Sequence, residues 1–314
     1  MKETRIKDRL QLVEKRDELV ACIGYFDGLH KGHQLLINEV KAVAKKRGLK
    51  SAIITFDPDP WTVVNNKSHV NHLTPMRDKI ALAESMGIDH LIIIEFTKDI
   101  SKLEPIEFVE TILVPLNVRV LVCGEDFRFG YRGAGNVTFL QEYARYYFDT
   151  HIMEIDYSVN KKIGTTAIVQ SLLKGDIESA NDMLGREYHL SGFVVKGHQR
   201  GREIGFPTAN IEITDEYVIP QEGVYAGYAT VRGKTYRSLI SIGHNPTFNH
   251  SIKLSVESHL LDFDEDIYGE VISQTFVSCL REQIKFDSID ALIVQMNEDK
   301  EKAVKIFDEI ESTI

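Results

Sequence analysis

Residues 20–47 read VACIGYFDGLHKGHQLLINEVKAVAKKR, and they join an apolar strand to an amphipathic helix through a glycine-rich turn. The β-branched run Val20–Phe26 predicts a buried strand, and the apolar spacing of Gln34–Arg47 predicts a helix. Strands that alternate with helices in this way form βαβ units with parallel strands. The stretch therefore predicts an α/β fold for the first part of the chain.

The same alternation continues through the first half of the sequence. Further buried strands are expected at Ser51–Phe56, His90–Phe96 and Arg119–Cys123. Helices are expected between them at Arg77–Met86 and Ile106–Leu113. Parallel sheets with right-handed crossovers bind ligands outside the carboxyl ends of their strands, so functional residues are expected there.

After Gly185 the pattern changes, because the expected strands follow one another without helices between them. These strands are Glu187–Val195, Gly223–Arg232, Lys234–Ile242, Lys253–Leu261 and Val271–Leu280. The last segment, Ser288–Ile310, returns to a helical period. We therefore expect two domains, residues 1–185 and 186–314, the second being a small antiparallel sheet or barrel.

The composition excludes several classes of protein. The 37 Lys+Arg and 47 Asp+Glu give a formal net charge of −10, which argues against broad binding of nucleic acid. The longest apolar runs, such as Leu91–Ile94, are too short to span a membrane, and the charged N-terminus lacks the apolar segment of a secretion signal. Cys22, Cys123 and Cys279 form no CxxC pair, so reduced thiols in a cytoplasmic protein are expected.

The two histidines of the first turn indicate phosphate binding. His30 and His33 share a face if the helix has begun, and free N–H groups at a helix N-terminus favour an anion. Two imidazole donors at that position could hold a triphosphate. A metal site is an alternative for which no third ligand is evident, and ordinary residues at a helix start are another.

The string GYFDGLHKGH as a whole resembles the His-x-Gly-His signature of the nucleotidyltransferase superfamily, in its FMN adenylyltransferase branch. The resemblance implies a Rossmann-like domain in which the histidines contact the phosphates of ATP. The phosphate of FMN would attack the α-phosphorus and expel pyrophosphate. The residues implied to bind ATP or phosphate are Gly24, Phe26, Asp27, Gly28, Gly32, Thr165 and Thr166.

Two further stretches resemble the same family. TFDPDP, at Thr55–Pro60, is similar to its TFxPHP turn, although Asp59 stands where the family usually has histidine. The loop Gly124–Asn136 is similar to a flavin-contacting loop, while by residue type alone it is a solvated glycine-rich connection. The residues implied to bind flavin are Asp57, Asp126, Phe127 and Arg128.

A second constellation lies in GHQRGREIGFPTANI, residues Gly197–Ile211. Thr208 and Asn210 are short neutral oxygen ligands of the kind that Mg²⁺ accepts beside phosphates, or they satisfy backbone groups of a turn. The string resembles the Gly-x-Pro-Thr-Ala-Asn motif of riboflavin kinase. The resemblance implies that Thr208 and Asn210 bind Mg²⁺, and that Gly197, Gly205 and Pro207 bind ATP.

Strand alternation places Ser255, Glu257 and His259 on one face of the strand that follows. A carboxylate in an apolar strand is either a solvated residue or an active group. In the riboflavin kinase family the matching glutamate is the catalytic base, which implies that Glu257 accepts the proton of the riboflavin 5′-hydroxyl. The stretch Leu280–Leu292 also fits that family and implies that Arg281 binds flavin.

The resemblance covers nearly the whole chain, which looks like a prokaryotic bifunctional riboflavin kinase/FAD synthetase. It implies a Rossmann-like α/β domain with a parallel sheet, followed by an antiparallel six-stranded β-barrel with a terminal helix. The implied ligands are ATP, ADP, Mg²⁺, riboflavin, FMN, FAD and pyrophosphate, with no tightly held prosthetic group. Binding to nucleic acid or membranes is not expected, and self-association stays open.

One departure from the family leaves two alternatives open. The family usually carries two arginines in the stretch that aligns with residues 163–169, and Ala167 and Val169 stand at those positions. A guanidinium that contacts a phosphate with two hydrogen bonds is hard to replace. The alternatives are a riboflavin kinase with an impaired first domain and a regulator that binds flavin or nucleotide.

Overall fold

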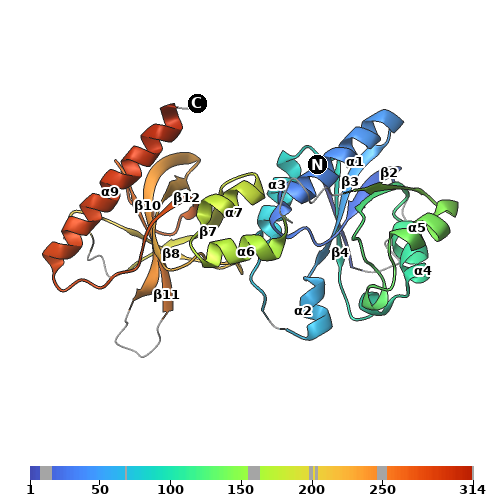
Figure 1. Cartoon of the computed structure of the whole chain (residues 1–314), viewed down its shortest axis with the longest axis horizontal. Coiled ribbons are helices and arrows are strands. Elements are labelled where there is room, and N and C mark those ends of the chain that lie inside the picture. The colour runs from blue at the N-terminus through green and yellow to red at the C-terminus, as the bar shows by residue number, and fades with distance from the viewer. Residues whose placement is uncertain are drawn as a thin grey trace. The chain divides into compact units, whose positions relative to one another are not determined.

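The computed structural model describes residues 1–7, 16–67, 69–154, 163–197, 201, 204–245 and 253–312 of the chain. They divide into two compact units, Met1–Ile163 and Gly164–Ile314. The first unit is built on a parallel sheet and the second on a closed barrel (Figure 1).

The sheet of the first unit has six strands in the order β1-β4-β3-β2-β5-β6, and every neighbouring pair is parallel. The strands are β1 (Lys2–Ile6), β2 (Leu19–Ile23), β3 (Lys50–Asp57), β4 (His90–Glu95), β5 (Val118–Gly124) and β6 (Asp149–Met153). The four predicted strands are the central ones, and their apolar runs are buried on both faces. The edge strands β1 and β6 were not predicted, because most of their residues are polar and partly exposed.

Helices cover both faces of this sheet. They are α1 (Lys31–Arg47), α2 (Pro60–Asn65), α3 (Met76–Ser85), α4 (Pro105–Phe108), the π-helix η4 (Val109–Leu113) and α5 (Val137–Tyr143), with short 3₁₀ turns at η2 (Asp27–Leu29), η3 (Ile100–Lys102), η5 (Tyr131–Gly133) and η6 (Ala144–Tyr146). Buried residues of α1 and α3 pack on one face of the strands, and those of α4, η4 and α5 pack on the other. The result is a three-layer α/β/α arrangement, which agrees with the predicted α/β fold with a parallel sheet.

The strand order reverses direction at β2. From β2 the chain moves to β3 and β4 on one side, and it later returns to β5 on the other side. Such a switch point leaves a crevice at the carboxyl ends of the two neighbouring strands, where open α/β sheets bind ligands. The turn after β2 and the loop after β5, both singled out in the sequence, start at this edge.

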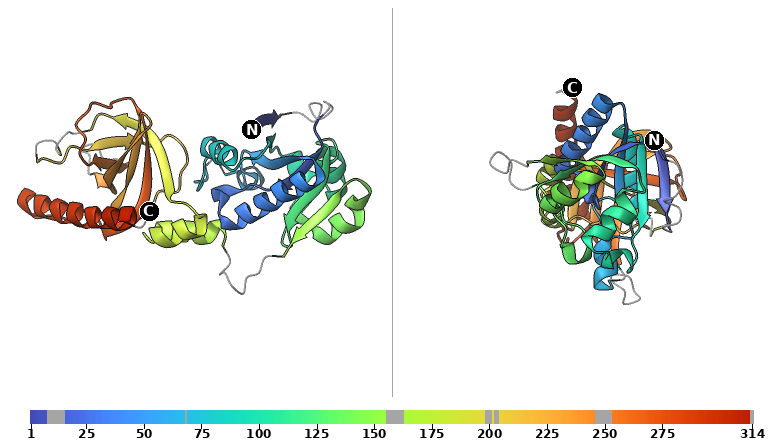
Figure 2. Two further views of the ribbon diagram at one scale, coloured as in Figure 1. Left: turned by 90° about the horizontal axis from the view of Figure 1, so that it is seen from above. Right: turned by 90° about the vertical axis from the view of Figure 1, so that its right-hand side faces the viewer.

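The second unit is a closed barrel of six antiparallel strands in the order β10-β11-β8-β7-β12-β9. The strands are β7 (Tyr188–Val195), β8 (Ala209–Glu212), β9 (Gly223–Val231), β10 (Lys234–Asn245), β11 (Lys253–Leu260) and β12 (Val271–Glu282). Figure 2 shows them curving around a common interior, with the long helix α9 (Ile289–Ser312) beside them. Ala303 and Phe307 of α9 are buried against the barrel strands β9 and β10.

Two helices, α6 (Thr165–Leu173) and α7 (Ile177–Leu184), precede the barrel and belong to the second unit. The backbone amide of Gln221 donates to the carbonyl of Leu172, and the side chain of Asn181 donates to the carbonyl of Phe276 on β12. The predicted domain boundary between residues 185 and 186 stays a prediction, whereas the two compact units meet between Ile163 and Gly164.

The fold class is confirmed in both halves, including the six-stranded barrel and the terminal helix. In the described part of the chain, no helix combines the length and the apolar character that a membrane span requires.

Candidate active sites

The turn after β2 adopts a strained backbone that brings the two histidines to the start of α1. Phe26 and Gly28 both have positive φ angles, of 55° and 80°. Glycine takes such a conformation without steric cost, which explains Gly28. A Cβ on Gly32 would come within 3.2 Å of the His30 ring, so a side chain there would press on the imidazole.

His30 and His33 form a stacked pair at the N-terminus of α1. Their ring centroids are 3.7 Å apart with an interplanar angle of 19°, and His30 is buried. Burial, together with the nearby His30 and Lys79, lowers the pKa of His33 well below its usual value. Two closely spaced imidazoles beside the positive end of a helix dipole form a site for an anion.

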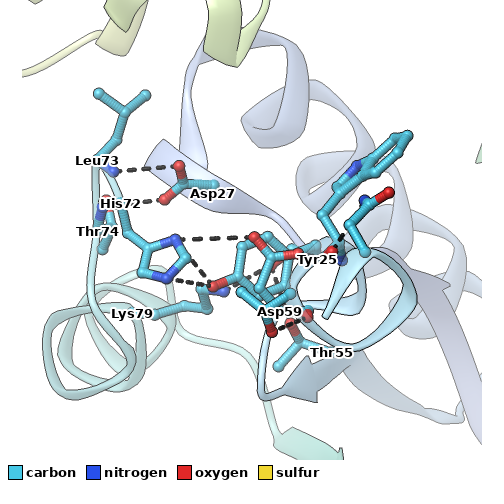
Figure 3. A network of polar contacts seen from close by, with 11 residues as sticks. Tyr25, Asp27, Thr55, Asp59, His72, Leu73, Thr74 and Lys79 are labelled. Carbon is cyan, nitrogen blue, oxygen red and sulfur yellow. Dashed lines mark hydrogen bonds and ion pairs between the residues drawn. The ribbon is translucent and has the colours of Figure 1, made fainter. Parts of the chain in front are cut away.

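Asp27 connects this turn to the segment before α3. Its carboxylate accepts hydrogen bonds from the backbone amides of Leu73, at 3.1 Å, and Thr74, at 3.0 Å (Figure 3). Burial raises the pKa of Asp27, while the two amides oppose the rise. The carboxylate is therefore engaged in shaping the site, and its predicted contact with ATP stays a prediction.

Lys79 of α3 is a buried cation beside the turn, and no sequence motif included it. Its Nζ atom donates to the carbonyl oxygen of Tyr25 at 2.6 Å and lies 3.7 Å from the centroid of the Tyr25 ring (Figure 3). The residue is 1% exposed, and burial lowers its pKa to about 8. Thr55 donates to the same carbonyl at 3.0 Å, so two side chains fix the peptide at Tyr25.

Asp59 of the TFDPDP turn caps helix α2. Its carboxylate accepts from the amide of Trp61 at 2.8 Å, and it lies 4.0 Å from Nδ1 of His72. The Tyr25 hydroxyl lies 3.2 Å from the same ring nitrogen (Figure 3). An imidazole thus reaches this turn from another segment, one that the sequence motifs did not include.

A cavity of about 1170 Å³ opens beside the turn, between α2 and the loop after β5. Its walls are largely aromatic and apolar, and four cations line it: Lys98, Lys102, Arg128 and Arg132. Of the predicted residues, Gly24, Phe127 and Arg128 line this cavity, and Asp57 and Asp126 do not. Asp57 instead pairs with Arg5 at 3.1 Å. The cavity suits a flat aromatic ligand that carries a negative charge.

Thr165 and Thr166 are the first two residues of α6, after Gly164 at its N-cap. The amides of Ala167 and Ile168 donate to the carbonyl of Gly164, and the N-cap has no side chain to cap the helix. The helix belongs to the second unit. The contact of both threonines with ATP stays a prediction.

In the second unit, the structure brings the turn GFPTAN, residues 205–210, next to Glu257 on β11. Thr208 Oγ1 donates to Glu257 Oε2 at 3.2 Å, and Asn210 on β8 is the register partner of Glu257 on β11. A Cβ on Gly197 would overlap the Asn210 amide, so the backbone approaches that side chain closely. Thr208, Asn210 and Glu257 together offer the neutral and anionic oxygens that fit Mg²⁺.

A cavity of about 460 Å³ is lined by Pro207, Thr208 and the segment Phe263–Tyr268, whereas Asn210 and Glu257 do not line it. Gly205 has a φ of 83°, and the amide of Phe206 donates to the carbonyl of Gly201 at 2.8 Å. These features fold the turn back on itself beside the cavity. The contact of Pro207 with ATP stays a prediction.

Arg281 lies at the end of β12 and forms a buried ion pair with Asp299 of α9. Its Nε and Nη2 atoms each lie 2.9 Å from Asp299 Oδ2, and Asp299 is 2% exposed. The guanidinium is therefore used to join α9 to the barrel. Flavin binding by Arg281 stays a prediction.

Comparisons with known proteins match a different enzyme family to each part of the chain. A family model described as FAD synthetase matches residues 12–167, and one described as riboflavin kinase matches residues 184–307. The bifunctional riboflavin kinase/FMN adenylyltransferase of Listeria monocytogenes is 39% identical over 293 residues, and the match covers 93% of each chain. The protein of the same name from Escherichia coli K12 is 33% identical over 291 residues, with 92% of each chain covered.

A solved structure has a similar fold along nearly the whole chain. A crystal structure described as a macrolide-efflux protein from Streptococcus pneumoniae has a TM-score of 0.88 at 30% identity, covering 96% of this chain and 98% of its own. With both family models and the curated relatives in agreement, the chain belongs to the bifunctional riboflavin kinase/FMN adenylyltransferase family.

Proposed function

We propose that the chain catalyses two successive transfers from ATP. In the first, riboflavin is phosphorylated to FMN and ADP is released. In the second, FMN receives the adenylyl group of another ATP, which gives FAD and pyrophosphate. The contact between Thr208 and Glu257 supports the kinase half of this proposal, because it joins the two kinase motifs. The histidine pair beside the aromatic cavity supports the adenylyl half.

For the kinase step, we assign the base to Glu257. Its carboxylate would take the proton of the riboflavin 5′-hydroxyl as that oxygen attacks the γ-phosphorus and the bond to ADP breaks. Thr208 and Asn210 would hold Mg²⁺, which supplies positive charge next to the phosphates when bound. Phosphoryl transfer depends mainly on positioning and charge stabilisation, so one carboxylate in this setting is sufficient.

For the adenylyl step, no proton has to be removed from the attacking group, because the phosphate of FMN is already ionised. Its oxygen would bond to the α-phosphorus of ATP as the bond to pyrophosphate breaks. His30, His33 and the first amides of α1 would hold the ATP phosphates. The aromatic cavity of about 1170 Å³ would hold the flavin, with Phe127 and Arg128 in its wall.

The assignment of chemistry to residues 1–185 and 186–314 follows the same proposal. We place FMN adenylylation in the first range and riboflavin phosphorylation in the second. A cytoplasmic location, a lack of nucleic-acid binding and the use of Mg²⁺ belong to the same proposal.

One experiment tests both activities. The purified chain is incubated with riboflavin, excess ATP and Mg²⁺, and the flavins are separated by chromatography over time. We expect FMN to form first and FAD to follow. Accumulation of FMN without FAD would reject the adenylyl transfer, and a complete lack of FMN would reject the kinase.

A further inference from the structure

His259 lies beside the GFPTAN turn, and neither motif assigns it a role. It stands two residues after Glu257 on β11, and so it lies on the same face of the strand. Its Nδ1 atom is 2.8 Å from the carbonyl oxygen of Pro207. Since a carbonyl oxygen only accepts hydrogen bonds, Nδ1 carries the hydrogen and donates it.

The imidazole is fixed by its surroundings as well as by this bond. His259 is 9% exposed, and its ring centroid lies 5.2 Å from that of Phe206, the residue before Pro207. One side chain of β11 therefore contacts two successive residues of the turn. A buried ring with this little freedom can hold the backbone that it contacts.

The backbone that His259 contacts is the one that carries Thr208. The carbonyl of Pro207 belongs to the peptide that leads into Thr208, and the Thr208 hydroxyl reaches Glu257 at 3.2 Å. The other end of the turn is closed by the bond from the Phe206 amide to the Gly201 carbonyl. The turn is thus tied to β11 through both Thr208 and His259.

We infer that His259 is a positioning residue of the kinase site, which holds the Pro207–Thr208 peptide so that the threonine hydroxyl faces Glu257 and the phosphates of ATP. This inference rests on the proposed riboflavin kinase activity. His259 does not contact the reacting atoms in this role. It acts through the turn, so its loss should weaken the use of ATP more than the use of riboflavin.

Three substitutions separate this role from general stability. His259→Asn keeps an N–H donor at the same number of bonds from the backbone as Nδ1. His259→Gln moves the donor one bond farther out, and His259→Leu removes it while keeping an apolar side chain in the same place. A merely structural role would not distinguish the asparagine variant from the glutamine variant.

We expect the leucine and glutamine variants to raise KM for ATP in FMN formation by about tenfold, the effect of losing about one hydrogen bond. The asparagine variant should stay close to wild type, and KM for riboflavin should change little in all three. Conversion of supplied FMN to FAD serves as the internal control, and it should be unaffected. Equal KM values for ATP in the wild type and the leucine and glutamine variants would overturn the inference.

A second measurement does not depend on activity. Hydrogen–deuterium exchange of the backbone amides in residues 204–209 is compared among the same variants without substrate. Exchange should be faster in the leucine and glutamine variants and unchanged in the asparagine variant. If the wild type forms no FMN, the proposed kinase function fails while exchange still decides the role of His259. Unchanged exchange in the leucine variant would reject that role.

Discussion

Thr208 and Glu257 are 49 residues apart in the sequence, and their side chains meet at 3.2 Å where β8 lies against β11. The pairing of these strands also sets Asn210 opposite Glu257. A hydroxyl, an amide and a carboxylate therefore come together, and Thr208 also lines a cavity of about 460 Å³. Each residue alone has an ordinary structural explanation, whereas the cluster fits phosphoryl transfer.

Replacing Glu257 with glutamine should abolish most FMN formation. The amide keeps the size of the side chain and an acceptor for Thr208, but it cannot take the proton of the riboflavin hydroxyl. Loss of a general base lowers such rates by about 10²–10⁴-fold. The measurement is the rate of FMN formation from riboflavin and ATP.

The control for Glu257→Gln is the conversion of supplied FMN to FAD by the same variant. That rate should match the wild type, because the adenylyl step is assigned to His30, His33 and the aromatic cavity, and Glu257 belongs to none of these. A riboflavin kinase rate that is unchanged in the glutamine variant would remove Glu257 from the role of base.

Arg128 should contribute to the binding of FMN through its charge. It lines the aromatic cavity of the first unit, and the ligand proposed for this cavity carries a phosphate. We expect Arg128→Ala to raise KM for FMN in FAD synthesis by about tenfold, and more at low ionic strength because salt screens exposed charges.

Arg145→Ala is the matched control for the charge. Arg145 is also exposed, but its guanidinium donates to Tyr146 and does not line the cavity. This variant should keep the wild-type KM for FMN. Equal increases in KM for both variants would mean that net charge, rather than the cavity wall, determines the effect.

Trp61 provides a direct signal for ligand in the same cavity. It is the only tryptophan of the chain, it is 70% exposed, and it lines the cavity from α2. A flavin that enters should cover the indole, so saturating FMN should protect Trp61 fluorescence from quenching by acrylamide. Fluorescence lifetimes avoid the error that flavin absorption would cause. Undiminished acrylamide quenching at saturating FMN would place the flavin elsewhere.

The sequence predicted the central elements well because burial leaves a strong apolar pattern. The strands β2 to β5 are apolar on both faces, and α9 shows a clear helical period. Strand β1 reads KETRI, where only Ile6 is buried, so an edge strand of this kind resembles a charged tail. Strand β8 was not predicted for another reason. Its residues Ala209–Glu212 begin inside the GFPTAN motif and resemble part of a turn.

The sequence predicted the motif residues of both candidate sites, but it did not predict the residues that contact and hold those motifs. The histidine pair and the glutamate of β11 carry recognisable local patterns. The structure places the pair at the start of α1 and brings the glutamate next to Thr208. Lys79 contacts Tyr25 across 54 residues of sequence, and His259 contacts Pro207 across 52. Such contacts depend on the packing of distant segments, which leaves no short-range pattern to find.

Lys79 should make the free energy of unfolding of the first unit increase as the pH rises through the alkaline range. Its pKa is lowered from 10.5 to about 8 by burial. Between these values the unfolded chain holds a proton that the folded chain has lost, so raising the pH favours the folded state. The contribution amounts to at most about 3 kcal/mol. It is complete above the unfolded-state pKa of 10.5, and it is lost progressively as the pH falls from there to the folded-state pKa of about 8.

Urea unfolding of the wild type and Lys79→Met over this pH range measures that contribution. Methionine fills a similar volume and does not titrate, so the variant should lack this part of the rise in unfolding free energy. All other titrating groups are shared, and the difference between the two curves isolates Lys79. Parallel curves would mean that the amine stays protonated when folded.

Val169→Arg should accelerate FAD synthesis. Val169 lies on α6 at a position where the family usually has arginine, and a guanidinium that contacts phosphate stabilises developing charge. We expect a gain of about tenfold or more in kcat for FMN adenylylation, by analogy with the cost of removing one such group. Val169→Leu is the control, and it should change neither activity. Riboflavin phosphorylation should also be the same in all three proteins, and an arginine variant that gains nothing in FAD synthesis would show that other cations already do this work.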